Sequence, residues 1–366
     1  MKKKMLVAGL TAAILMISTV GVFADGTRDD EKVGAVYAMT NAATGNEVVI
    51  FDRDFEGMLT SAGSIATGGT GSGSALDPLG SQGALVLSED GRWIVAVNAG
   101  SNEISVLRIL RDGLALADKV DSGGVFPVSV TVYHNLVYVL NAGGSPNITG
   151  FRLSHIGKLI PLEKSTRSLG TGGFAQVGFD PEGETLVVTD KADNKILVYS
   201  VSHDGLPGMT PVTSPSYGVT PFGFIFDQRG HLLVVEAGTN AVSSYKILPD
   251  DTLQVISGSV PNGQIAACWI AGNERGDVFT DNPGTHSISA YTEMAGEGSL
   301  VLLNGVAGTG NTPLDLSITG NGRFLYALDP TNGTVDMFHV ERDGSLTDLG
   351  TVPGGFSIFA QGIVAR

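Results

Sequence analysis

The chain has 366 residues and a formal net charge of −15, with 22 Lys and Arg against 37 Asp and Glu. A chain this acidic, with no basic stripe, repels a phosphate backbone, so nucleic acid is not an expected partner. Cys268 is the only cysteine, which excludes an internal disulfide, and its apolar neighbours predict a small buried strand residue.

Residues 1–24 have the pattern of a secretory signal peptide. Lys2, Lys3 and Lys4 precede an apolar stretch over residues 5–22, and Val-Phe-Ala closes the segment before Asp25. The apolar stretch is short for a membrane-spanning helix, although an uncleaved anchor is the alternative. Residues 25–32 are polar, which predicts a flexible segment. We therefore expect a secreted or periplasmic monomer that is free of the membrane after cleavage.

The rest of the chain repeats one short pattern seven times. Each copy is an apolar strand that ends in an amide or a carboxylate, then a turn, then a second strand. The polar residues that close the first strand are Asn41, Asn98, Asn141, Asp190, Glu236, Asp281 and Asp329. They are separated by 57, 43, 49, 46, 45 and 48 residues. A period near 45 residues with all-β content is typical of propeller blades.

Four strand-like runs, called A to D here, make up each copy. In the second copy they cover residues 83–88, 93–98, 104–109 and 114–119, with Gly in the tight turns between them. A surplus strand over residues 359–365 would pair with residues 36–41 and close the ring, leaving no free sheet edge. We predict an all-β fold, a single seven-bladed β-propeller of four-stranded antiparallel blades over residues 33–366.

Residues 67–80 form a Gly-rich insertion between the first two copies. The run GGTGSG lacks the Lys-Ser/Thr ending of a phosphate-binding loop and lies between strands rather than before a helix. We therefore predict a flexible inter-blade segment that could fold over the mouth of the channel.

The expected propeller places a ring of polar side chains at one mouth of its central channel. Strand A lines the channel and begins at the face where strand B ends, so the seven closing residues gather there. The polar residues near the start of strand A join them: Gln82, Gln176, Asp315 and Gln361. Such side chains either cap turns by binding nearby backbone amides or form a polar ligand site, and both roles stay open.

Asp190, Glu236 and Asp281 belong to adjacent blades of the predicted ring. Converging carboxylates would raise one another's pKa or recruit a cation such as Ca²⁺, although Lys191 could neutralise Asp190 locally and no cofactor is required.

The six histidines show no paired metal-binding spacing. Four fall at or near predicted turns, which favours solvated residues over metal ligands: His134, His155, His203 and His231. His286 is the exception, because it follows Asp281 in a B–C loop on the candidate face.

Several segments resemble the lactonase family of seven-bladed propellers, which includes one bacterial type of 6-phosphogluconolactonase and the fungal carboxymuconate cyclase. They are FDPEGETLVV over residues 179–188, TPLDLSI over residues 312–318 with GRFLY over residues 322–326, and Asn-Ala-Gly, which is repeated at residues 98–100 and 141–143. The resemblance covers about residues 33–366, and residues 80–87, 129–132 and 135–143 are similar to an exported bacterial branch.

The resemblance implies lactone hydrolysis, with departures at the expected site. Family enzymes carry a histidine entering the fourth blade, where this chain reads GGFAQV over residues 172–177. Glu236 matches the family's glutamate after strand B of blade 5. Glu236 or Asp281 is then the candidate base that activates water, and Arg167 or a bound cation would stabilise the oxyanion.

Two functions remain open. The first is hydrolysis of a lactone or related cyclic ester at the channel mouth, with a phosphosugar disfavoured by the acidic mouth and by export. The second is a platform without catalysis that binds a small polar ligand, a surface polymer or another protein.

Overall fold

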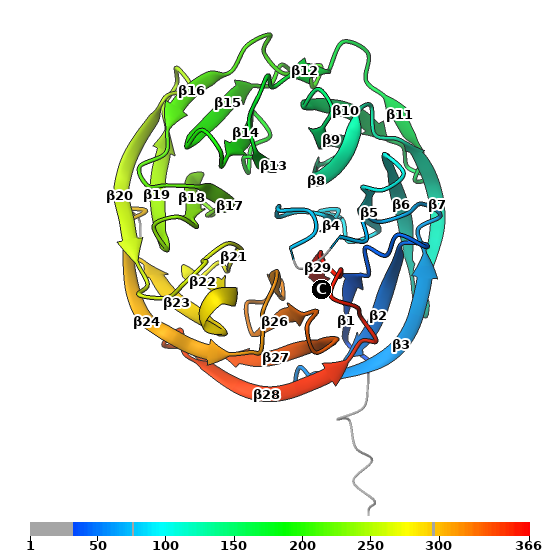
Figure 1. Cartoon of the computed structure of the whole chain (residues 1–366), viewed down its shortest axis with the longest axis vertical. Helices are drawn as coiled ribbons and strands as arrows, with labels where there is room; N and C mark the ends of the chain where they lie inside the picture. Colours follow the sequence, from blue (N-terminus) through cyan, green and yellow to red (C-terminus); the bar gives the residue numbers. More distant parts are fainter. Residues whose placement is uncertain (1–31, 75–76, 295–296) are drawn as a thin grey trace, which may run out of the picture.

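In the computed structural model the chain is a ring of seven blades around a central axis (Figure 1). The structure describes residues 32–74, 77–294 and 297–366. The predicted signal peptide, residues 1–24, and residues 25–31 of the predicted flexible segment lie outside these residues. The predicted all-β propeller of four-stranded antiparallel blades is confirmed.

The strands follow one another outward from the axis in each blade. The innermost A strands are β4 (Leu85–Leu87), β8 (Val125–Tyr133), β13 (Phe174–Phe179), β17 (Pro221–Phe226), β21 (Ile270–Gly272), β25 (Leu316–Ile318) and β29 (Ile363–Ala365). The B strands are β1 (Gly34–Met39), β5 (Trp93–Asn98), β9 (Leu136–Gly143), β14 (Thr185–Asp190), β18 (His231–Glu236), β22 (Asp277–Asn282) and β26 (Phe324–Asp329).

The outer strands complete each sheet. The C strands are β2 (Glu47–Arg53), β6 (Glu103–Leu110), β10 (Asn147–Leu153), β15 (Lys195–Ser200), β19 (Ala241–Ile247), β23 (Ser287–Glu293) and β27 (Thr334–Val340). The D strands are β3 (Leu59–Ala66), β7 (Gly113–Asp121), β11 (Leu159–Pro161) with β12 (Arg167–Ser168), β16 (Val212–Pro215), β20 (Leu253–Pro261), β24 (Leu300–Thr309) and β28 (Leu346–Pro353). A 3₁₀ turn, η2 (Pro283–Thr285), interrupts the β structure.

The last strand of the chain closes the ring, as the sequence predicted. β29 pairs antiparallel with β1, with Val36 opposite Ala365 and Ala38 opposite Ile363. The first blade therefore takes its innermost strand from one end of the chain and its other three from the opposite end. Because β29 and β1, from the two ends of the chain, are hydrogen-bonded in one sheet, the ring is closed and β1 is not left as an unpaired edge strand.

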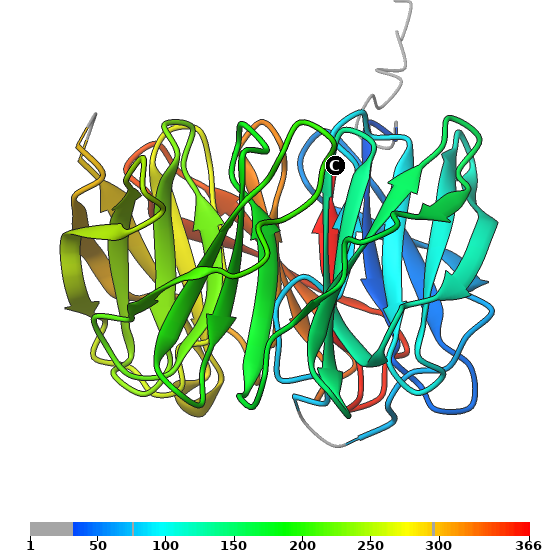
Figure 2. The same ribbon diagram turned by 90° about the horizontal axis from the view of Figure 1, so that it is seen from above.

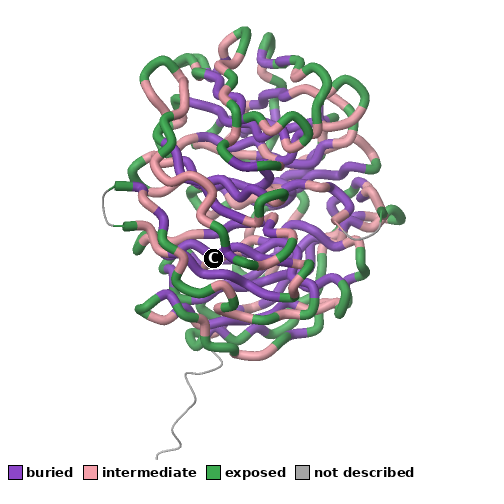
Figure 3. Tube along the Cα trace, turned by 60° about the vertical axis from the view of Figure 1, so that its left-hand side comes forward, coloured by how far each residue is buried: buried purple, intermediate pink, exposed green. Residues whose placement is uncertain are grey.

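The apolar core lies between the blades, where the B and C strands are buried on both faces. All six residues of β5 are buried, as are all six of β14, and large rings such as Tyr138 fill the space between neighbouring sheets. Figure 3 shows burial concentrated in the inner strands and exposure at the loops and the outer edge. This pattern explains why these strands read as nearly continuous apolar runs.

The propeller has two distinct faces, visible edge-on in Figure 2. The B strands end at one face, here called the strand-end face. The A–B turns lie at the other, here called the hairpin face, which also holds the C-terminal Arg366 near Lys32. Gly91 and Gly230 occupy A–B turns with φ of 65° and 78°, a conformation that glycine adopts without strain. The described residues contain no helix long and apolar enough to cross a bilayer.

Candidate functional site

The seven closing residues form a ring at the strand-end face, as predicted, but their side chains are almost entirely buried. Asp190 is 3% exposed and the other six are 0% exposed. Burial without partners would be costly for amides and carboxylates, so the contacts of each side chain decide what the ring can do.

Glu236 has the most hydrogen-bond donors of the ring. Its Oε1 accepts hydrogen bonds from Gly218 N at 2.7 Å, Ser243 Oγ at 2.8 Å, Ser216 Oγ at 3.1 Å and Tyr245 Oη at 3.2 Å. Its Oε2 accepts a hydrogen bond from the Ser259 hydroxyl. A carboxylate held by this many donors is stabilised in place and is shielded from a substrate.

Asp281 ties two inner strands together. Its Oδ1 accepts Trp269 N at 3.0 Å and its Oδ2 accepts Asp315 N at 2.8 Å. Burial raises the pKa of Asp281 well above its usual range. Burial also raises the pKa of Asp315 to about 7, against the opposing effect of backbone amides that include Leu316 N.

The remaining ring residues bind the loops beside them. Asp190 Oδ1 accepts Gly173 N at 3.0 Å, and Asp329 Oδ2 accepts Asn311 N and Thr312 N, both at 3.0 Å. The amides also hold loops: Asn98 Oδ1 accepts a hydrogen bond from Thr67 Oγ1, Asn41 Nδ2 donates to Ser72 Oγ, and Asn141 Nδ2 donates to the Ser122 carbonyl. The structure therefore uses the ring to hold loops onto the ends of the B strands.

Two glutamines at the start of the A strands join blades rather than facing an open mouth. Gln176 Oε1 accepts Phe224 N at 2.7 Å, and its Nε2 donates to the Phe224 carbonyl at 3.0 Å. Gln82 makes the same paired contact with Ile270 N and O, at 3.0 and 2.9 Å, and so links blade 2 to blade 6. These side chains replace the hydrogen bonds that an inner strand edge lacks.

The segment over residues 77–82 crosses the strand-end mouth of the channel. Leu79 is buried, and its N–H donates to Gln361 Oε1 at 3.0 Å. The Ser81 carbonyl accepts both Gln361 Nε2 at 2.6 Å and Trp269 Nε1 at 2.8 Å. Figure 1 shows the chain before β4 reaching into the centre of the ring. The described part of the predicted insertion is thus packed into the mouth; its flexibility stays a prediction.

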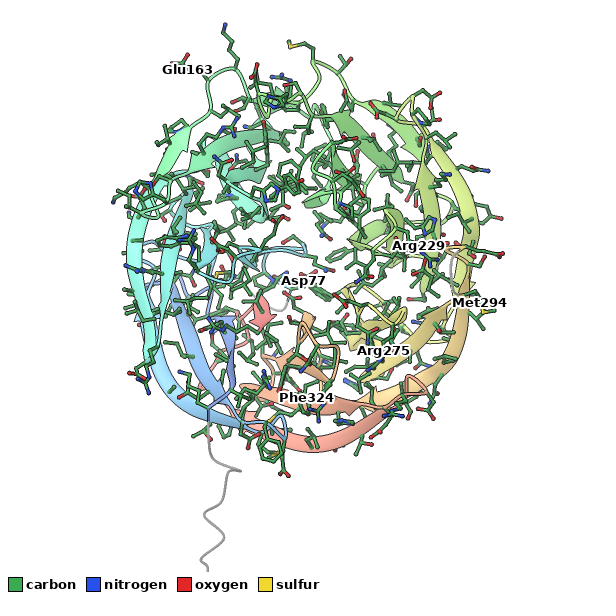
Figure 4. The ribbon with its side chains drawn as sticks, turned by 180° about the vertical axis from the view of Figure 1, so that it is seen from behind. Asp77, Glu163, Arg229, Arg275, Met294 and Phe324 are labelled. Carbon is green, nitrogen blue, oxygen red and sulfur yellow. The ribbon has the colours of Figure 1, made fainter. Side chains whose placement is uncertain are left out.

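Charged groups surround this segment. Lys191 donates to the Gly80 carbonyl instead of pairing with Asp190, which corrects the expected local neutralisation. Burial lowers the pKa of Lys191, and the charge of Asp77 opposes that effect; burial likewise raises the pKa of Asp77. Figure 4 shows Asp77 near the axis. Cys268 is half-buried and precedes β21, so it is not the buried strand residue that the sequence predicted.

Arg167 lies in β12, the outer strand of blade 3. Its guanidinium donates to the carbonyls of Gly208 at 2.7 Å, Lys164 at 2.7 Å and Thr166 at 2.9 Å, and also to that of Pro207. The structure does not bring Arg167 together with Glu236 or Asp281. His286 is exposed in its loop and contacts the Asn311 carbonyl.

The central channel itself forms a cavity of about 500 Å³. Its wall comes from the A strands of all seven blades, and Gln82 and Gln176 lie toward its strand-end side. At the hairpin face it is lined by Glu89, Tyr133 and Asp180. These residues were not among the candidates predicted from the sequence, which lie where strand B ends and strand A begins; the acidic residues of the A–B turns were the available signal.

The complete propeller matches several solved structures. No family model matches the chain. A candidate 6-phosphogluconolactonase from Bacteroides uniformis is 19% identical, with a TM-score of 0.73 over 91% of this chain and 99% of that one. The periplasmic gluconolactonase of Pseudomonas aeruginosa is 15% identical, with a TM-score of 0.71 over 91% of this chain and 98% of its own. The fold is that of the lactonase-like propellers. A Lactobacillus plantarum protein is similar at 17% identity, a TM-score of 0.74 and coverage of 92% and 99%. At these identities the likeness establishes the fold.

Proposed function

We propose that the protein is an exported lactonase-like enzyme that opens a lactone or related cyclic ester in its central channel. The match of the whole propeller to a gluconolactonase and a candidate 6-phosphogluconolactonase carries this proposal. The channel supports it, because a cavity of about 500 Å³ is in the size range of small-molecule sites and accommodates a single sugar ring. The periplasmic location of the gluconolactonase agrees with the signal-like sequence of residues 1–24.

The substrate enters from the hairpin face in this proposal, since residues 77–82 occupy the opposite mouth. The general base is then a carboxylate at the open end rather than Glu236 or Asp281. Asp180 is half-buried there, and its Oδ1 accepts Thr185 N at 2.9 Å, which holds the side chain beside the channel. Glu89 is the second candidate, with His134 Nδ1 at 2.9 Å from its Oε2.

The chemistry requires a water, a base and an oxyanion donor. A carboxylate takes a proton from water as the oxygen attacks the lactone carbonyl, and the ring oxygen leaves after accepting a proton. Tyr133 lines the channel beside Asp180 and offers a hydroxyl to the developing oxyanion. Because the open end carries carboxylates, a neutral lactone is favoured over a phosphorylated one.

Base consumption by the purified chain in a pH-stat tests the proposal against a panel of neutral sugar and aliphatic lactones. We expect turnover, and we expect Glu89→Gln with Asp180→Asn to lower kcat by at least about 100-fold, as for loss of a general base. Asp343→Asn is the matched control, because Asp343 occupies a C–D turn and caps Ser345 N at 3.0 Å away from the channel lining. Turnover that the double variant leaves unchanged would contradict the assignment of the base.

A ligand-binding platform without catalysis is the second candidate. It is favoured by one observation: the ring carboxylates and Arg167 have their hydrogen bonds occupied by the protein itself. Under this function, lactones or other polar ligands would raise the Tm without being hydrolysed. Val86→Trp, which adds an indole to the channel wall, would abolish that rise, whereas Val255→Trp on the exposed outer strand β20 would not.

A further inference from the structure

A cluster of one histidine and two carboxylates lies at the hairpin face, outside the channel. Asp227 and His231 flank the A–B turn of blade 5, and Glu293 ends β23 in blade 6. His231 Nδ1 is 2.8 Å from Asp227 Oδ2 and 3.3 Å from Glu293 Oε1. The three donor atoms lie within 4.8 Å of one another. The prediction that His231 is a solvated turn residue is therefore wrong.

All three side chains are held in a largely buried position. Side-chain exposure is 13% for His231, 13% for Asp227 and 10% for Glu293. Gly298 covers the imidazole so closely that a Cβ there would lie 2.8 Å from His231 Cγ. A largely buried histidine between two acids forms either an ion-paired triad with them or a set of metal ligands, and the charge of the surroundings distinguishes the two.

The charge of the cluster is left uncompensated. No Lys or Arg among the described residues lies within ion-pair distance of Asp227 or Glu293, so His231 is their one basic partner there. Arg229 and Arg275 line the adjoining hollow, but neither forms an ion pair with the cluster, and Arg275 pairs with Asp277 Oδ2 at 2.8 Å. With both carboxylates ionised, the cluster carries at least one net negative charge even when the imidazole is protonated, and a divalent cation would neutralise that charge.

The two carboxylate oxygens of Asp227 make different contacts. Oδ1 accepts the backbone N–H groups of Arg229 at 2.9 Å and His231 at 2.7 Å, which fixes the turn. Oδ2 is directed at the imidazole. The backbone therefore fixes the Asp227 carboxylate with its Oδ2 only 2.8 Å from the imidazole nitrogen, so two of the potential metal ligands are already adjacent.

An adjoining hollow leaves room for the rest of a coordination sphere. It has a volume of about 160 Å³ and is lined by Asp227, Glu293, Arg229, Arg275 and Met294, among others. Figure 4 shows the three labelled members, Arg229, Arg275 and Met294, in one sector of the propeller. This volume holds several waters, since each needs about 30 Å³.

We propose that Asp227, His231 and Glu293 bind a divalent transition-metal ion, with Zn²⁺ the best fit to the donors. Ligands of tetrahedral Zn²⁺, at about 2.0–2.1 Å from the ion, lie about 3.3 Å from one another. The observed separations of 2.8 and 3.3 Å need only small movements to reach that geometry. The imidazole nitrogen and the small number of protein oxygens disfavour Ca²⁺, which takes six to eight oxygen ligands. Water from the hollow completes the coordination.

Titration of the chelator-treated full chain with Zn²⁺ by calorimetry tests this site, with metal analysis after dialysis. We expect one Zn²⁺ per chain, unaffected by excess Ca²⁺. Glu293→Gln and His231→Asn should each weaken binding by at least about 100-fold, more than the loss of a residue that only orients a ligand costs. Asp227 is left unchanged because its Oδ1 holds the turn.

His134→Asn is the matched control, since His134 also pairs with a carboxylate on the hairpin face but is 70% exposed and has the single partner Glu89. It should leave Zn²⁺ binding unchanged. Co²⁺ in place of Zn²⁺ gives a second measurement on the unaltered protein, where a four-coordinate ion with an imidazole ligand produces strong visible absorption. Absence of stoichiometric binding, weak hexahydrate-like Co²⁺ bands, or full affinity in Glu293→Gln would each overturn the proposal.

Discussion

The ring at the strand-end face and the cluster at the hairpin face both contain buried carboxylates, but the surroundings of these carboxylates differ. In the ring, Glu236 is fully buried among backbone and hydroxyl donors. In the cluster, Glu293 faces a second carboxylate with a shared histidine as the basic partner. The number of polar groups in a region is thus a poor guide to chemistry. The informative quantity is how much of their charge and hydrogen-bonding capacity the protein already satisfies.

Replacing a glutamate by glutamine in the ring and in the cluster should show the difference between the two regions most clearly, and the larger effect is expected in the ring. Glu236→Gln puts an amide NH₂ against donors such as Gly218 N and leaves buried groups unpaired. We expect it to lower the free energy of unfolding by about 2–3 kcal/mol. Urea denaturation of the variant measures this, with the exposed Glu163→Gln as control. A loss below the error of the control would show that the ring carboxylate does not support the fold.

A buried carboxylate without the donors of the ring should instead destabilise the protein. Asp336 is 5% exposed, its Oδ2 has no hydrogen-bond partner among the described residues, and burial raises its pKa to about 7. Since the folded-state pKa exceeds the unfolded value, the contribution of Asp336 to stability is most favourable at low pH and falls as pH rises from about 4 through 7. Asp336→Asn should therefore gain about 2 kcal/mol over the parent at pH 8 and almost nothing at pH 4.

Thermal or urea unfolding of Asp336→Asn and the parent across this pH range gives the comparison. An equal difference at pH 4 and pH 8 would show that the carboxylate's ionisation is not the cause.

Gln82 tests whether the polar groups lining the channel hold the ring together. Its side-chain amide binds Ile270 of blade 6, and Gln82→Ala leaves that N–H and C=O unpaired by protein. We expect a loss of about 1–2 kcal/mol, reduced where water can replace the bonds. Hydrogen exchange at the Ile270 amide should rise in the same variant. Unchanged exchange there would argue that the cross-channel contact contributes nothing.

Glu293→Gln should have the smallest effect on the metal-free protein. Burial and the nearby Asp227 raise the pKa of Glu293 to about 7, so its ionisation above that pH is unfavourable in the folded state. Removing it should change stability by less than about 1 kcal/mol, in the stabilising direction. Urea denaturation of the chelator-treated variant and parent at pH 8 measures this difference in the free energy of unfolding. A loss as large as that of Glu236→Gln would mean that the cluster, like the ring, serves the fold.

Much of the architecture follows from local sequence pattern. The repeat of apolar strands, the turn glycines and the surplus segment over residues 359–365 predicted seven blades and their closure, and β29 pairs with β1 accordingly. The positions of the seven closing residues at the strand ends were predicted as well, because strand direction alternates regularly within each blade. Their role could not be predicted, since each depends on a loop such as Gly172–Gly173 or Asn311–Thr312 folding back over it.

The candidate site depended on contacts between distant segments. Gln82 meets Ile270, and His231 meets Glu293, only because the ring brings blades 2 and 6 across the channel and blades 5 and 6 side by side. No spacing rule within the sequence encodes such pairs.

The blade count, the strand order and the acidic character of the protein follow from its sequence alone, because periodicity and composition act locally and additively. Only the folded ring shows which polar groups are hydrogen-bonded within the protein to stabilise the fold and which carry uncompensated charge. That distinction depends on burial and on partners supplied by other blades, which exist only once the ring has closed.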